Sequence, residues 1–222
     1  VLPVYRGELQ CRGLGMAVDI WNEAGQPVRE EKGELVCTAP FPSMPIGFWN
    51  DPDGSKYHHA YFARFADVWC HGDFAEWTDH GGMVIHGRSD STLNRHGVRM
   101  GSADIYAAVD TVDGIVESLV IGAEQTDGSY WMPLFVVLEP GRELDDELVT
   151  AIKSRIRERA SARHVPDEVI AVPGIPHTRT GKKLEVPVKR LLQGAELAAV
   201  VNPASVDDPS LLDVFAELAT KR

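Results

Sequence analysis

The chain has 222 residues, of which 44% are hydrophobic and 25% are charged. This composition is that of a globular protein with one large or two small domains, and it excludes a mainly disordered chain. The formal net charge of −11 argues against nucleic acid and membrane surfaces as partners, and the longest apolar run, at 134–138, is far shorter than the roughly 20 residues that span a bilayer.

Three cysteines, Cys11, Cys37 and Cys70, lie far apart in apolar stretches, which predicts free, buried thiols and no disulfide bond. Free thiols are typical of a reducing compartment, and no leader segment is recognisable in the first residues, so we expect a cytoplasmic protein. Because the sequence starts at Val1 and not at Met, we also expect it to be part of a longer polypeptide.

The first 90 residues predict a β-rich module. Short runs bounded by Gly and Pro predict strands at 16–21, 34–38, 68–71, 74–78 and 83–86. One short helix is expected after the turn at 51–54, because Tyr57, Ala60, Tyr61, Arg64 and Phe65 recur at helical intervals. The apolar side of this helix should pack inward.

From about residue 90 the pattern becomes that of an α+β domain. Ser102 is expected to cap a helix that runs to about Val112, and Asp145 to begin a longer, strongly periodic one. Strands are predicted at 115–122 and 131–138, and the unbroken Leu-Phe-Val-Val-Leu of the second indicates burial on both faces. Shorter helices are expected at 186–192 and 211–218, with an irregular connection at 195–208.

Three segments carry candidate chemistry, and each is weak alone. The Gly-Lys pair at 181–182 lies in a predicted loop and can present an amine to a phosphate, although a solvated turn is the commoner use of such a sequence. A predicted hairpin around 95–97 is flanked by Arg88 and Arg99, which can face one anion, or it is an ordinary hairpin. At 71–73 a His-Gly-Asp sequence ends a predicted strand, and its aspartate can accept both hydroxyls of a ribose or simply form a turn.

Other classes of site find no support in the sequence. Residues 176–183 lack the first glycine and the final Ser or Thr of a Walker A loop, and 13–15 lacks the third glycine of a dinucleotide-binding fingerprint. The histidines show no metal-ligand spacing, so we expect no metal site. No Gly-x-Ser-x-Gly sequence indicates a serine hydrolase.

The order of the three segments is more specific than any one of them. His-Gly-Asp at 71–73, Gly-Arg-Ser-Asp at 87–90 and Gly-Val-Arg at 97–99 precede Thr-Gly-Lys at 180–182, and in this order they resemble the motifs of adenylate-forming enzymes. The resemblance covers most of the chain and implies an α+β fold in two parts. Residues 1–89 would be the β-rich, barrel-like end of a large AMP-binding domain, and residues 90–222 a small, mobile lid domain with its hinge at Asp90.

The resemblance implies an AMP-forming acyl-CoA ligase. The carboxylate of an acid would attack the α-phosphate of ATP, supplied as its magnesium complex, and the thiol of CoA would then displace AMP from the acyl-adenylate. Three further segments, 47–57, 161–166 and 181–186, resemble those of ligases that use acetoacetate, so the resemblance implies acetoacetate as the acid, with acetate or propionate as alternatives.

By the same resemblance, four residues would act on ATP. Lys182 would stabilise the charge that develops at the α-phosphate, as electrostatic catalysis requires. Asp73 would hold the ribose hydroxyls, Arg88 would contact the ribose and phosphate, and Arg99 would hold phosphates before the lid turns. An exposed Lys182 is also expected to be reversibly acylated, with a lysine acetyltransferase and a deacetylase as partners.

The resemblance places CoA against the lid. After a turn at Asp90, the loop with Asn94 and Gly97 would approach the site, and the glycine would leave room for the slim pantetheine arm. Arg157 matches a position used for the CoA phosphate, although an ordinary solvated helix face explains it equally well.

Two family elements are missing from the chain. Neither the phosphate loop rich in Ser, Thr and Gly nor the adenine-binding segment occurs, so the remainder of the large domain is expected before Val1 and this portion alone is expected to be inactive. The sequences at 71–74 and 94–96 also depart from the usual family pattern. The alternative is a non-catalytic module that binds a nucleotide or CoA.

Overall fold

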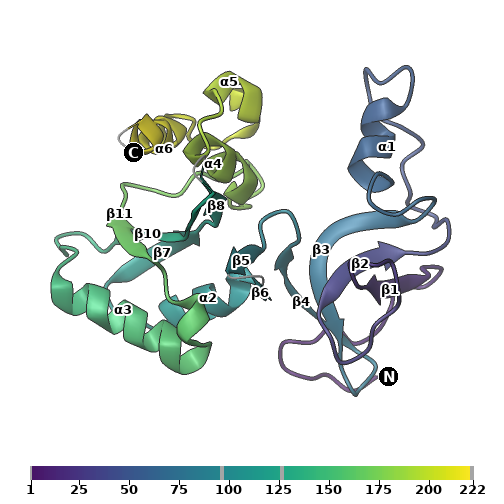
Figure 1. Ribbon diagram of the computed structural model, residues 1–222, viewed down its shortest axis with the longest axis horizontal. Helices are drawn as coiled ribbons and strands as arrows, with labels where there is room; N and C mark the ends of the chain where they lie inside the picture. The colour runs from purple at the N-terminus through teal and green to yellow at the C-terminus, as the bar shows by residue number, and fades with distance from the viewer. Residues whose placement is uncertain (1, 96–97, 126–127, 221–222) are drawn as a thin grey trace. The chain divides into compact units, whose positions relative to one another are not determined.

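The computed structural model describes residues 2–95, 98–125 and 128–220, and the chain divides into two compact units, residues 1–90 and 91–222 (Figure 1). The assignment of these units to the end of a large domain and to a mobile lid stays a prediction. Within the described part of the chain, no helix is both long enough and apolar enough to cross a membrane.

The first unit is built on an antiparallel meander of four neighbouring strands. They follow one another in chain order: β1 (Val18–Trp21), β2 (Gly33–Cys37), β3 (Trp69–Trp77) and β4 (Met83–Arg88). Its strands contribute the buried residues of a small core cluster, Ile20, Ala75 and Met83. The expected β-rich module is therefore present, with one long, curved strand at its centre (Figure 1).

That long strand, β3, corrects the two separate strands expected at 68–71 and 74–78. It runs without interruption, and a bulge replaces the expected break. Between the pairs Val36–Cys70 and Glu34–Phe74, β2 has one residue whereas β3 has three. Gly72 makes the bulge possible because its φ of 83° lies in the left-handed region that glycine adopts without strain.

The helix α1 (Ser55–Tyr61) forms after the predicted turn but ends earlier than its sequence period suggested. It has no buried residue, so the apolar side expected to pack inward is only partly covered. The ring of Tyr61 instead stacks on Trp69 of β3 with a centroid distance of 3.6 Å. The helix thus rests on the sheet through aromatic rings that stay partly exposed.

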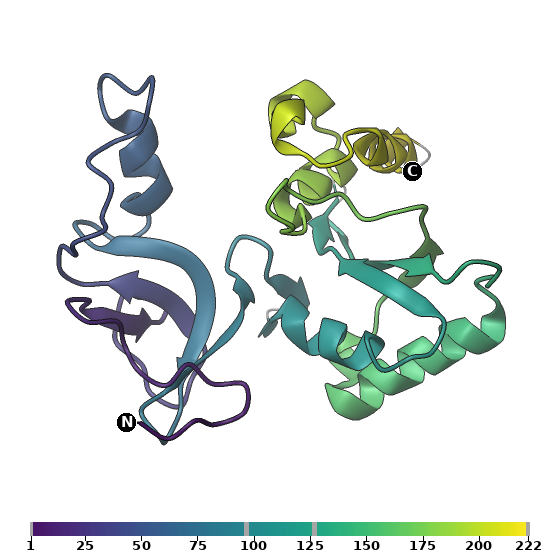
Figure 2. The same ribbon diagram turned by 180° about the vertical axis from the view of Figure 1, so that it is seen from behind.

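The second unit is an α+β domain around a three-stranded sheet in the order β11-β10-β7, with β10 antiparallel to β7 and parallel to β11. The strands are β7 (Ile115–Val120), β10 (Pro133–Leu138) and β11 (Glu168–Ala171). Helices α2 (Ser102–Val109) and α3 (Asp146–Arg159) pack on one face, and α4 (Glu185–Leu192) and α6 (Ser210–Thr220) on the other (Figure 1; Figure 2).

Shorter elements complete this unit. Two small strand pairs, β5 with β6 and β8 with β9, form separate two-stranded sheets, and a short helix and two 3-10 turns lie in the connections. Their bounds are β5 (Leu93–Arg95), β6 (Val98–Met100), β8 (Ala123–Glu124), β9 (Tyr130–Trp131), α5 (Leu197–Val200), Ala162–His164 and Pro203–Ser205. The connection expected to be irregular at 195–208 therefore contains α5 and one of the 3-10 turns.

The central strand β10 confirms burial on both faces. Phe135 belongs to the core under α4 and α6, whereas its neighbours Leu134 and Val136 belong to the core under α2 and α3. Asp145 caps α3 as expected, since its side chain accepts the backbone N–H of Leu148 at 2.8 Å.

Ser102 does not cap α2, and the predicted extension of that helix to Val112 is also wrong. The N-cap is Gly101, and α2 ends at Val109. The hydroxyl of Ser102 points instead to Glu185, to which it donates at 3.2 Å. The thiols are free as predicted, but only Cys37 is buried, whereas Cys70 is partly buried and Cys11 is exposed.

Candidate functional site

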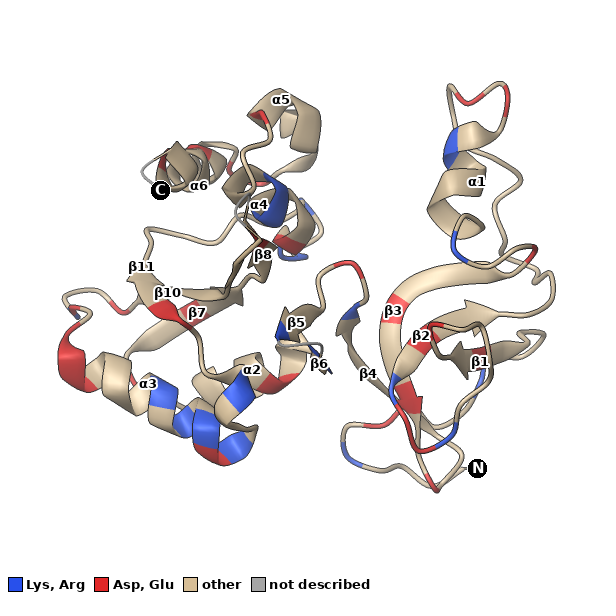
Figure 3. Ribbon diagram, viewed as in Figure 1, with Lys and Arg blue, Asp and Glu red and all other residues tan. Residues whose placement is uncertain are grey.

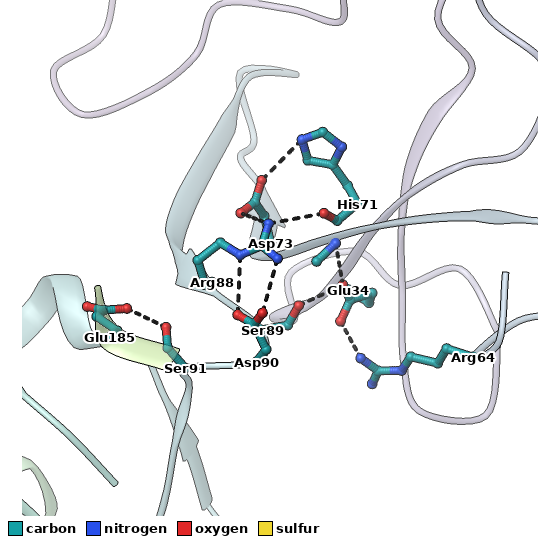
Figure 4. Close-up of polar contacts among 10 residues, drawn as sticks. Glu34, Arg64, His71, Asp73, Arg88, Ser89, Asp90, Ser91 and Glu185 are labelled. Carbon is teal, nitrogen blue, oxygen red and sulfur yellow. Dashed lines mark hydrogen bonds and ion pairs between the residues drawn. The ribbon is translucent and has the colours of Figure 1, made fainter. Parts of the chain in front are cut away.

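Arg88, the last residue of β4, packs against the bulge of β3. Asp73 and Arg88 are register partners across the two strands, with Arg88 Nη1 3.6 Å from Asp73 Oδ1. The guanidinium also donates to the carbonyl of His71 at 3.2 Å (Figure 4). A Cβ on Gly72 would lie only 2.6 Å from Arg88 Nη2, so the guanidinium rests directly on a bare backbone. The bulge therefore brings Asp73 and Arg88 together.

Arg88 is also bound to the residue expected at the hinge. Its Nε donates to Asp90 Oδ1 at 3.2 Å and its Nη2 to Asp90 Oδ2 at 3.1 Å, the bidentate geometry of a strong Arg–carboxylate pair. Burial opposes the charge of Arg88, but the carboxylates of Asp90, Asp73 and Glu34 outweigh it and raise the pKa above its ordinary value. Arg88 is thus a fixed cation with two carboxylates beside it.

Asp73 is oriented from its other side by a histidine. Trp69 Nε1 donates to His71 Nδ1 at 3.4 Å, and His71 Nε2 lies 3.4 Å from Asp73 Oδ2. Because Nδ1 accepts, this pattern assigns the proton of a neutral His71 to Nε2, which then donates to Asp73. The carboxylate is held in place and its remaining lone pairs can accept hydroxyl groups.

Glu34 of β2 is a buried carboxylate that the motifs did not reveal. It is 1% exposed, accepts the N–H of Gly72 at 3.1 Å and the hydroxyl of Ser89 at 2.7 Å, and pairs with Arg64. A buried charge is costly unless it is paired and hydrogen-bonded, and these three partners meet that need. The one signal for Glu34 in the sequence is a charged residue within the otherwise apolar strand 33–37.

A pocket of about 590 Å³ opens beside this cluster within the first unit. Its lining combines aromatic rings with charged groups and includes Tyr61, Trp69, Arg64, Arg88 and Asp90. Cys70 also lines it, but burial, and then the nearby charge of Glu34, raise the pKa of this thiol to about 12. The thiol is therefore protonated at neutral pH and is no candidate nucleophile.

Lys182 is exposed on a tight turn of the second unit. Thr178 donates its N–H to the carbonyl of Lys182 at 2.8 Å and accepts the N–H of Lys182 on Oγ1 at 3.0 Å. Gly181, with a φ of 80°, closes the turn. The backbone of Lys182 is thus fixed while its side chain faces solvent.

Neighbours on both sides tie this turn to the sheet. His177 Nε2 lies 2.7 Å from Glu117 Oε1 on β7. Lys183 Nζ donates to the carbonyl of Ser118 at 2.7 Å and sits over the ring of Tyr106 at 4.1 Å from its centroid. Because His177 and Lys183 are bound to β7, the turn between them is held in place and carries Lys182 as an exposed amine.

The β5–β6 pair presents Asn94 and Arg99 opposite one another. The N–H of Asn94 donates to the hydroxyl of Tyr130 at 2.8 Å, and Arg99 Nη2 donates to Thr92 Oγ1 at 3.1 Å. A Cβ on Gly122 would lie 1.8 Å from the Tyr130 hydroxyl, so this glycine makes room for the tyrosine.

Sequence reasoning missed Tyr130, because no motif marks it. Gly97, expected to face CoA, lies outside the described residues.

Arg157 lies exposed in the last turn of α3. Basic residues gather on the C-terminal half of this helix (Figure 3), where they also favour the negative end of the helix dipole. The structure thus leaves Arg157 on a basic surface that suits either a phosphate contact or a solvated face.

The structure therefore brings together Asp73, Arg88 and Asp90, and separately Asn94 and Arg99. Arg88 and Arg99 belong to different units, so their joint action on one anion stays a prediction. Among the described residues, no group of three or more His, Cys, Asp or Glu side chains is arranged to hold a metal ion.

Comparisons with known proteins agree with the resemblance that the motifs indicated. Residues 105–182 match the family of AMP-binding enzyme C-terminal domains. The chain is 56% identical to the acetoacetyl-coenzyme A synthetase of Rhizobium meliloti (strain 1021) over 97% of its own length and 33% of that protein, and 46% identical to the acetoacetyl-CoA synthetase of Gallus gallus over 98% of its length and 32% of that protein.

A solved structure gives the same result. The acetoacetyl-CoA synthetase from Streptomyces lividans matches 99% of this chain and 33% of its own chain, with a TM-score of 0.93 and 61% identity. The chain thus spans about a third of the length of the relatives that it matches.

Proposed function

We propose that the chain is the C-terminal part of an AMP-forming acetoacetate–CoA ligase. The proposal rests on the match of residues 105–182 to AMP-binding enzyme C-terminal domains and on the similarity to acetoacetyl-CoA synthetases over nearly the whole chain. In the first half-reaction the acetoacetate carboxylate attacks the α-phosphate of ATP and pyrophosphate leaves. In the second, the thiol of CoA attacks the acyl carbon, giving acetoacetyl-CoA and AMP.

The observation that carries this proposal is the fixed Asp73–Arg88 pair on the β3 bulge. A carboxylate held by His71 and Arg88 can accept the two ribose hydroxyls, while a permanently charged guanidinium beside it faces the adjoining phosphate. In the proposal, the exposed Lys182 reaches the α-phosphate in one position of the second unit, and Arg99 holds the outer phosphates.

The second position of that unit serves the thiol step. Rotation about Asp90 brings Asn94 of β5 to the pantetheine arm, and the proposal assigns the same role to Gly97, which lies outside the described residues. Arg157, within the basic surface of α3, takes a CoA phosphate. The exposure of Lys182 also supports its reversible acetylation by a lysine acetyltransferase, which would remove the charge that the first half-reaction needs.

The test uses the full-length protein that contains this chain. Purified protein is given ATP, magnesium and CoA with acetoacetate, acetate or propionate in turn, and AMP and acyl-CoA are quantified. Equal amounts of AMP and acetoacetyl-CoA, formed fastest from acetoacetate, are expected. Faster turnover of acetate or propionate would overturn the choice of acid, and nucleotide binding without any AMP formation would establish a non-catalytic module instead.

A further inference from the structure

We infer that Glu34 and Glu185 are positioning residues that hold the chain on the two sides of Asp90, so that hinge rotation is confined to Asp90 and carried directly to the Lys182 turn. This inference rests on the proposed function, in which Asp90 is the hinge. It assigns a role to Glu34, which no motif singled out, and to Glu185, which lies in the 181–186 segment but has no role there of its own.

On the first side, Ser89 is bound to its unit at two points. Its hydroxyl donates to Glu34 Oε1 at 2.7 Å, and its N–H donates to the carbonyl of Gly72 at 2.9 Å (Figure 4). Glu34 is itself held by the N–H of Gly72 and by Arg64, and β2 lies between β1 and β3 in the sheet. The residue before the hinge is therefore fixed to the β-sheet through a buried carboxylate.

On the second side, Ser91 is bound in the same way to the other unit. Its hydroxyl donates to Glu185 Oε2, while Glu185 Oε1 accepts the Tyr106 hydroxyl at 2.6 Å and that of Ser102 at 3.2 Å. Glu185 begins α4, whereas Ser102 and Tyr106 belong to α2. Burial, and then the charge of Glu185, raise the pKa of Tyr106, so its hydroxyl keeps the proton that it donates. Ser91 is thereby tied to two helices at once.

Glu185 also lies three residues after Lys182. Between them, Lys183 packs over the ring of Tyr106 and donates to the carbonyl of Ser118. The same tyrosine thus contacts both Glu185 and the residue next to Lys182. Through Glu185 and Tyr106, Ser91 and the Lys182 turn belong to one rigid assembly.

Asp90 differs from the two serines that flank it. It is exposed, and its carboxylate is held by the Arg88 side chain, a contact that can break without disturbing Ser89 or Ser91. Hinges are a few residues that absorb large changes in φ and ψ between rigid bodies. The contacts Ser89–Glu34 and Ser91–Glu185, here called the two clamps, hold the chain on each side of Asp90. The change in φ and ψ therefore occurs at the backbone of Asp90.

The experiment is a double-mutant cycle in the full-length enzyme. Ser91→Ala, Glu185→Gln and the double variant are compared for the single-turnover rate of acetoacetyl-adenylate formation. Each single variant is expected to lower this rate roughly tenfold or more with little change in the KM for ATP, because the Lys182 turn is misplaced. The double variant should be no slower than the worse single variant, since the effect of Ser91 runs through Glu185. Ser91→Thr should keep most of the rate because it retains a hydroxyl.

Ser154→Ala, which removes an exposed hydroxyl on α3, is the matched control and should be without effect. Additive losses in the double variant, or rates equal to that of the control, would overturn the inference for Glu185.

The clamp on the first side is tested without reference to activity. Ser89→Ala in the full-length protein should speed amide hydrogen exchange at 88–91 several-fold, and Ser91→Ala should do so at 90–93, while Ser154→Ala leaves both segments unchanged. Unchanged exchange in the two hinge variants would refute the clamps even in an enzyme that is fully active. Faster exchange in a protein that makes no adenylate would support the clamps and refute the proposed function.

Discussion

At the scale of single residues, the position of the Arg88 guanidinium depends on the absence of a side chain at Gly72. Gly72→Ala would place a Cβ 2.6 Å from Arg88 Nη2 and would also strain a backbone with a φ of 83°. The guanidinium must then move away from Asp73. We expect the KM for ATP to rise at least tenfold, measured by initial rates in the full-length protein.

The control for this change is Gly81→Ala in the turn between β3 and β4. Gly81 has a comparable φ of 74°, but no atom lies within 4 Å of an added Cβ. This variant should lose some stability from backbone strain and keep the KM of the unmodified protein. Equal KM values in both variants would contradict the packing argument.

Lys182 should be the position most sensitive to loss of charge. It is exposed on a turn whose backbone bonds do not involve its side chain, so Lys182→Ala should fold normally. We expect the rate of adenylate formation to fall by roughly two to three orders of magnitude, because a preorganised cation is removed from the developing charge. Arg179→Ala removes an exposed cation from the same turn and should change the rate less than threefold; an equal loss in both would show that only general surface charge matters.

The residues that could be predicted from the sequence are those that stand in a recognisable order. Asp73, Arg88 and Lys182 are candidates of this kind. The structure shows the first two in contact, and the roles of all three stay predictions. Glu34 and Tyr130 could not be found, because each acts through a contact with a residue distant in the sequence. Only the folded chain shows that the hydroxyl of Tyr130 meets the N–H of Asn94.

At the scale of elements, the start of α3 depends on one cap. Asp145 accepts the N–H of Leu148, one of the donors that a helix leaves without an intrahelical partner. Asp145→Ala should destabilise the first turn of α3 by about 1 kcal/mol, seen as faster amide exchange at residues 147–149. Asp145→Ser keeps a capping oxygen and should exchange nearly as slowly as the unmodified protein, so equally fast exchange in the two variants would argue against the cap.

The edge strand β1 should contribute stability that depends on pH. Asp19 Oδ1 accepts from the N–H of Ile20 at 2.9 Å, from Trp77 Nε1 at 3.1 Å and from Arg29 at 2.8 Å. Burial opposes the charged form, but these donors outweigh it and lower the pKa of Asp19. A carboxyl with a depressed folded pKa stabilises the fold above its unfolded value of about 3.9, and this stability is lost as the pH falls through the folded value.

Asp19→Asn should therefore weaken the first unit at pH 7 and have a shrinking effect below about pH 4. The comparison is the midpoint of urea unfolding of the two proteins between pH 3 and pH 7, followed by Trp fluorescence. If the two unfolding midpoints differed by the same amount at every pH in this range, protonation of Asp19 would not be coupled to folding.

Elements with a strong period were the ones that the sequence predicted well. α3 repeats its apolar residues every three or four positions, and β10 is an unbroken apolar run, so pattern and structure agree there. β3 was divided in two because Gly72 looks like a break, whereas a bulge allows the strand to pass through it. Ser102 looked like a cap because nothing local reveals its distant partner Glu185.

At the scale of the molecule, the two units are stabilised by cores of very different size. The second has a buried cluster on each face of its sheet, with Phe135 and Phe215 in one and Ile152 and Ile156 in the other. The first has a small cluster around Ile20 and leaves large apolar side chains exposed at Leu14, Ile46 and Trp49. Because burial of apolar surface is the main stabilising contribution, the second unit should be more stable than the first when the two are produced separately.

We therefore expect residues 91–222, produced alone, to unfold cooperatively on heating with a near-ultraviolet circular dichroism signal from the packed Trp131. Residues 1–90 alone should melt broadly at a lower temperature or aggregate through their exposed apolar side chains. The measurement is thermal unfolding of both fragments by circular dichroism, with light scattering to detect association. A first unit that stays monomeric and melts as sharply as the second would mean that its aromatic contacts, such as the stack of Tyr61 on Trp69, stabilise it more than its small core does.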